Sequence, residues 1–85
     1  MQASLTVGVD MAKKEFVAAL FQEQPQALLG KFTNDVPGYE ALSAQVSAAC
    51  HELGVAQVQL VIEATGGYEA ALVAHAYEQG WLVSM

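Results

Sequence analysis

Two short segments of the chain alternate between apolar and polar residues in the way that β-strands do. In Leu5 to Asp10 every second residue is strongly apolar, and the same alternation returns in Val58 to Glu63. A period of two places the apolar side chains on one face of a strand. Each segment therefore predicts a strand with one clearly apolar face, and each ends in a carboxylate.

Three other segments indicate strands of different kinds. Glu15 to Gln22 is apolar at both parities, which predicts a central strand buried on both faces. Pro25 marks a turn, after which we expect Ala27 to Thr33 to return as an antiparallel neighbour. Trp81 to Met85 is expected to begin a last strand.

Two segments have the spacing of helices. Residues 33–35 are polar candidate caps before Pro37, whose fixed φ suits a first helical turn. Apolar residues follow at helical spacing until Gly54, which is expected to end the helix. After a break at residues 65–67, a second helix is predicted from about Tyr68 to Gln79.

The order of these elements is strand, strand, strand, helix, strand, helix, strand. It predicts an α/β fold in which an antiparallel meander passes into right-handed crossovers onto parallel strands. This order resembles that of ribonuclease-H-like domains, with a mixed sheet of strand order 3-2-1-4-5 and helices after strands 3 and 4. Because no covering helix follows the last strand, we expect residues 1–85 to be a fragment of such a domain, truncated before the last helix.

Composition and charge limit the possible functions. The chain is 54% hydrophobic and only 14% charged, which favours a folded sheet covered on both faces. It has neither a long apolar stretch nor a basic amino-terminal leader, so we expect a soluble, cytoplasmic protein with no membrane partner. A net charge of −6 is the wrong sign for gripping a phosphate backbone, so nucleic-acid affinity must come from a bound metal, a partner or other residues.

The carboxylates of Asp10 and Glu63 are the strongest candidates for chemistry. If their two strands are parallel neighbours, the side chains lie about 5 Å apart. Gly8, two residues before Asp10, leaves room above the sheet. The pair would then suit a shared Mg²⁺ or Mn²⁺, which prefers hard oxygen ligands. The alternative is that Asp10 caps a loop and Glu63 makes a surface ion pair.

Five residues in the segments after these acids are weaker candidates for nucleic-acid contacts. Lys13 and Lys14 can reach a phosphate near the metal or remain solvated. Gly66 and Gly67 can present backbone N–H groups to an anion or simply form a tight turn. Thr65 can cap the second helix or contact nucleic acid, and capping is the favoured interpretation.

Three stretches carry a family resemblance: VGVDMAKKEF, FTNDVPGYEAL and VIEATGGYEAAL. They are similar to the amino-terminal part of the DEDD transposases of the insertion-sequence 110 group, which are related to the Piv-type DNA invertases. The resemblance implies a RuvC-like catalytic domain in which Asp10 and Glu63 are the first two acids of a tetrad. The remaining acids, in an Asp-x-x-Asp segment, and a serine nucleophile are expected beyond Met85.

The resemblance also implies a function and partners. The complete protein is expected to cut and rejoin DNA phosphodiesters during insertion-sequence transposition with Mg²⁺ or Mn²⁺, as a homo-oligomer whose target recognition is guided by an RNA from the element. The fragment by itself is expected to be inactive. Two alternatives remain open: an actin-like nucleotide phosphotransferase, disfavoured because no glycine follows Asp10 closely, and a non-catalytic assembly module that pairs through an uncovered sheet.

Overall fold

All seven predicted strands and helices are present in the computed structural model, which describes residues 4–21, 27–63 and 66–85. Their bounds differ from the predictions by a few residues at most. The elements are β1 (Ser4–Met11), β2 (Glu15–Leu20), β3 (Ala27–Thr33), α1 (Val36–Leu53), β4 (Gln57–Glu63), α2 (Ala70–Glu78) and β5 (Leu82–Ser84).

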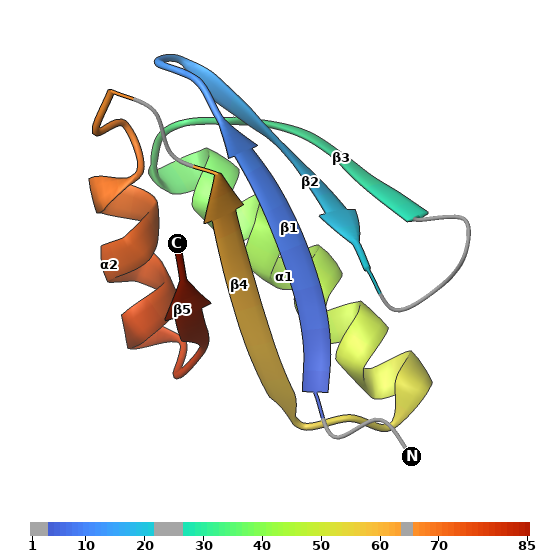
Figure 1. The fold of residues 1–85 in the computed structure, drawn as a ribbon. Helices are drawn as coiled ribbons and strands as arrows, with labels where there is room; N and C mark the ends of the chain where they lie inside the picture. The colour runs from blue at the N-terminus through green and yellow to red at the C-terminus, as the bar shows by residue number, and fades with distance from the viewer. Residues whose placement is uncertain (1–3, 22–26, 64–65) are drawn as a thin grey trace.

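The strands form one mixed sheet in the order β3-β2-β1-β4-β5 (Figure 1). β1, β2 and β3 form the antiparallel meander, whereas β4 runs parallel to β1 and β5 parallel to β4. The helices follow β3 and β4 along the chain. The predicted α/β class, strand order and helix positions are therefore confirmed.

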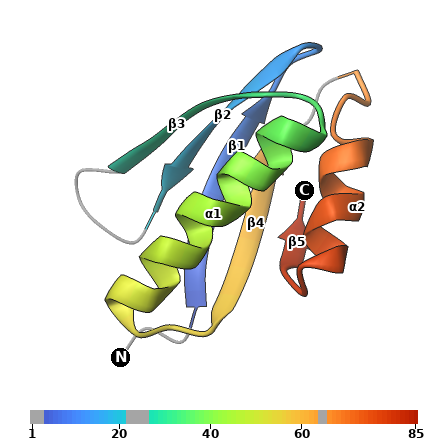
Figure 2. The same cartoon turned by 180° about the vertical axis from the view of Figure 1, so that it is seen from behind.

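The hydrophobic core lies between the two helices and one face of the sheet. Figure 2, turned by 180° from Figure 1, views the sheet from this side, with α1 lying across it in front. Every second residue of β1 and of β4 is buried there because alternate side chains point to the same face. The largest fully buried side chains are those of Leu5, Val7, Phe16, Leu42, Val46, Leu60 and Leu72.

The other face of the sheet is covered by neither helix, which corrects two predictions. The sheet is not covered on both faces, and β2 is not buried on both faces, because Val17 is 36% exposed and Phe21, just beyond the strand, is 42% exposed. Moreover, β2 was predicted to be the central strand; it does lie inside the sheet, but the middle strand of the sheet is β1. Phe16 and Ala18 of β2 point toward the helices and are buried. Val17 and Ala19, which alternate with them, point toward the open face and remain partly exposed.

Local chemistry explains where the helices begin and end. Asp35 is the N-cap of α1, as its carboxylate accepts a 3.0 Å hydrogen bond from the backbone N–H of Gly38. Gly54 ends α1 with a left-handed φ of 70°. α2 starts at Ala70, later than predicted, because Gly66 and Gly67 hold positive φ angles of 77° and 78° in a preceding turn.

Among the described residues, no helix combines the length and apolar character needed to cross a membrane.

Candidate carboxylate site at the ends of β1 and β4

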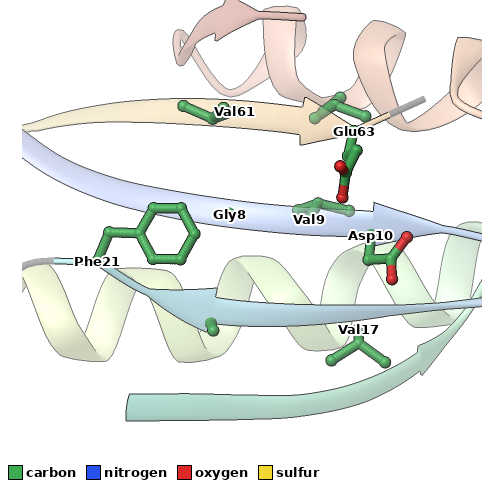
Figure 3. A pocket seen from close by; sticks show the side chains of 9 residues that line it. Gly8, Val9, Asp10, Val17, Phe21, Val61 and Glu63 are labelled. Carbon is green, nitrogen blue, oxygen red and sulfur yellow. The ribbon is translucent and has the colours of Figure 1, made fainter. Parts of the chain in front are cut away.

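Asp10 and Glu63 stand side by side in the sheet. In the parallel pairing of β1 with β4 they are register partners, at the last paired position of both strands. Partners at the same position of neighbouring strands point to the same face. Both side chains are exposed on the face that carries no helix, and Figure 3 shows the side chain of Glu63 directed toward β1. The expected neighbourhood of the two acids is thus present.

The two acids line one end of an open hollow of about 470 Å³ on this face. The ring of Phe21 lies over Gly8 (Figure 3), where an added Cβ would come within 2.3 Å of the ring. The space left by Gly8 therefore holds an aromatic side chain, and the hollow extends beside it toward the carboxylates. The lining residues are Gly8, Val9, Asp10, Val17, Ala19, Phe21, Val61, Ile62 and Glu63.

The alternative roles of the two acids, a loop cap for Asp10 and a surface ion pair for Glu63, find no support within the described residues. There, neither carboxylate makes a hydrogen bond or an ion pair. The ion pair of this region joins Lys31 to Glu15, with 3.6 Å between the ammonium nitrogen and a carboxylate oxygen. Both carboxylates thus keep their oxygen lone pairs available to an external ligand.

The donor set fits a hard divalent cation in kind but not in number. Carboxylate oxygens are the ligands that Mg²⁺ and Mn²⁺ prefer. Within residues 4–21, 27–63 and 66–85, however, no group of three or more His, Cys, Asp or Glu side chains is placed to hold a metal. Asp10 and Glu63 can supply part of a coordination shell, and water, substrate or further protein groups must complete it.

The weaker candidates lie in the two connections that follow the acids. Lys13 and Lys14 are exposed between β1 and β2, beyond the end of β1 that carries Asp10. Gly66 and Gly67 form the turn between β4 and α2, ahead of the first turn of the helix. Thr65 lies outside the described residues. A role for any of them in nucleic-acid binding stays a prediction.

The side chain of Asn34 has a role that its sequence context, which suggested only a candidate helix cap, did not predict. The structure gives the capping role to Asp35, whereas the Asn34 side chain reaches the connections after β1 and β4. No pattern in the sequence could have shown this, because the partners are main-chain carbonyls more than 20 residues away.

A mixed five-stranded sheet of order 3-2-1-4-5 with two helices defines this chain as a ribonuclease-H-like domain of the α/β class. The model of one protein family, described as transposase and comprising the DEDD enzymes of the insertion-sequence 110 group, matches residues 7–85. The chain belongs to this family. A comparison with curated proteins gave no match.

Family membership sets the broad function. Transposases move DNA segments, so membership implies DNA as the partner and an enzymatic role in moving it. Insertion-sequence transposition is the process to which the chain belongs.

Proposed function

We propose that residues 1–85 are the amino-terminal part of a RuvC-like catalytic domain that cuts and rejoins DNA phosphodiesters with the help of divalent metal. Asp10 and Glu63 are proposed as two of the metal ligands. The observation that carries this proposal is their pairing at the last shared position of two parallel strands, on the face left open by the helices.

The chain's own residues supply positioning and charge. When bound, Mg²⁺ or Mn²⁺ stabilises negative charge on the oxygens of a phosphodiester under attack. Asp10 and Glu63 would hold such an ion at the open face, where a DNA strand has access. Lys13 and Lys14 would contact a neighbouring phosphate, and the backbone N–H groups of Gly66 and Gly67 would offer further contacts, as would Thr65.

Two carboxylates are half of the four acids that the family resemblance implies. We therefore propose that this chain binds metal weakly and does not cleave DNA by itself. Incubating it with supercoiled plasmid and Mg²⁺ should give no more nicking than the Asp10→Asn variant gives. Robust cleavage that Asp10→Asn abolishes would contradict the proposed dependence on acids outside this chain.

Two further partners are proposed for the complete protein. A guide RNA from the element is supported by the family resemblance. Assembly with a second copy is supported by exposed apolar side chains on the open face and on the edge strand, where Leu28 of β3 is 70% exposed. Membership in the transposase family disfavours the alternative function, that of an actin-like phosphotransferase.

The metal ligands can be tested by following the amide NMR signals of the chain during titration with Mn²⁺, which broadens nearby signals. The ends of β1 and β4 should broaden first. Asp10→Asn and Glu63→Gln should each weaken binding at least about tenfold because each removes a ligand. Glu52→Gln, which removes the same charge from the exposed end of α1, is the matched control. Equal affinity in all four proteins would reject the assignment.

A further inference from the structure

Three connections meet at the end of the sheet that carries the two acids. Residues 12–14 lead from β1 into β2, residues 66–69 lead into α2, and residues 34 and 35 join β3 to α1. The pairing of β1 with β4 ends at Asp10 and Glu63, and among the described residues the two strands are not paired with each other beyond that point, although β1 still pairs with β2 at Met11. Other contacts must fix how the two strand ends sit against each other.

The side chain of Asn34 makes such contacts. Its amide nitrogen lies 3.3 Å from the carbonyl oxygen of Ala12, 3.2 Å from that of Lys13 and 3.1 Å from that of Tyr68. Its backbone N–H donates to the carbonyl of Lys14 at 2.9 Å. One residue therefore bonds to three consecutive carbonyls after β1 and to one carbonyl ahead of α2. Because an amide group carries only two N–H bonds, its three acceptors share them.

Tyr39 fixes the orientation of this amide. Its hydroxyl donates to the side-chain oxygen of Asn34 at 2.5 Å, and its ring is 4% exposed and stacked on Phe16 in the core. Burial, with a smaller contribution from the charge of Asp35, raises the pKa of Tyr39, so the hydroxyl keeps its proton at neutral pH. Flipping the Asn34 amide would direct its oxygen at three carbonyls, so one orientation satisfies every partner.

Only an amide of this length meets these requirements. It must donate to carbonyls on one side and accept from the tyrosine hydroxyl on the other. Aspartate has the same shape and can still accept from Tyr39, but it has no N–H to donate and places a negative charge against the carbonyl oxygens. Asn34→Asp therefore removes the side-chain bonds to both connections while preserving side-chain volume, and it leaves the backbone bond to Lys14 in place.

We propose that Asn34 is a positioning residue: it ties together the two connections after Asp10 and Glu63 and so fixes the spacing of the two carboxylates. This inference rests on the metal-binding function proposed above. The same bonds hold the main chain of residues 12–14, and with it the starting points of the Lys13 and Lys14 side chains. Asn34 itself contacts neither metal nor substrate in this role.

The test combines amide hydrogen exchange of the metal-free chain with the Mn²⁺ titration. In Asn34→Asp, amides at residues 12–14 and 66–68 should exchange faster together, while those in the middle of β1 and β4 stay protected. Mn²⁺ affinity should fall about tenfold, the size typical of losing a group that orients metal ligands. Tyr39→Phe, which frees the amide but keeps its donors, should give a smaller drop and serves as the second variant should Asn34→Asp not fold.

Val46→Ala separates positioning from general stability. This residue is buried in α1 at 1% exposure, about three helical turns beyond Asn34 along the chain, so the variant should unfold at a lower temperature with unchanged Mn²⁺ affinity. A folded Asn34→Asp with full affinity, or a loss that Val46→Ala reproduces, would overturn the proposal. If the unchanged chain shows no Mn²⁺ site at the two acids, the proposed function fails, and the exchange data still decide whether Asn34 joins the connections.

Discussion

Replacing Asp10 by asparagine should stabilise the chain when metal is absent. Asp10 and Glu63 are register partners on neighbouring strands, and such strands lie about 4.8 Å apart. Among the described residues, neither carboxylate has a hydrogen bond or an ion pair that would offset a repulsion between the two charges. Two unit charges about 5 Å apart in water repel by about 0.8 kcal/mol, and physiological salt roughly halves this value. For a domain of this size the full value corresponds to a rise in Tm of about 3–6 °C.

Calorimetry at pH 7 in low salt, with and without Mg²⁺, measures this effect. In the presence of a chelator, Asp10→Asn should have the higher Tm. Mg²⁺ should raise the Tm of the unchanged chain more than that of the variant, because only the intact pair offers two carboxylates to the ion. A lower Tm for metal-free Asp10→Asn, or an equal gain from Mg²⁺ in both proteins, would refute the shared-site reasoning.

Three further outcomes test the fold around the site. In chemical denaturation, Gly38→Ala should be strongly destabilising, because the added Cβ would come within 1.7 Å of the carbonyl oxygen of Thr33. Gly8→Ala should lower the stability little, because the nearest atoms belong to the half-exposed ring of Phe21, which can rotate away. Equal losses in the two variants would show that these packing differences do not matter. Two hydrogen bonds hold the pKa of Asp35 below the ordinary 3.8, the larger effect coming from the hydroxyl of Thr33 and the smaller from the backbone N–H of Gly38. The stabilisation of α1 by the Asp35 carboxylate is therefore present above pH 3.8 and is lost as the pH falls below that value. Asp35→Asn should flatten this part of the Tm profile, and an unchanged acid slope would contradict the assignment.

The apolar patterns predicted the buried face of β1 and β4 correctly, but they misjudged β2. Residues 15–22 are apolar at both parities, and the structure leaves Val17 and Phe21 partly exposed. A sequence pattern records which side chains tolerate burial, not whether an element is present to cover them. The late start of α2 was missed for a local reason, since the glycines at 66 and 67 adopt left-handed conformations and extend the turn.

The neighbourhood of the two acids could be predicted because it depends only on strand ends. Neighbouring parallel strands present their carboxyl ends at the same edge of a sheet, so two such strands that each end in an acid bring those acids together. The contacts of Asn34 could not be predicted in this way. Its side chain bonds to main-chain carbonyls, which every residue type carries, across sequence separations of 21, 22 and 34 residues.

The position of a bound ion tests the central claim most directly. Crystals of the chain grown with Mn²⁺, measured near the manganese absorption edge, would show the ion as an anomalous peak. The account predicts a peak between the carboxylates of Asp10 and Glu63 on the open face of the sheet, absent from crystals of Glu63→Gln. A well-occupied manganese peak elsewhere, with both carboxylates bound only by water, would contradict it.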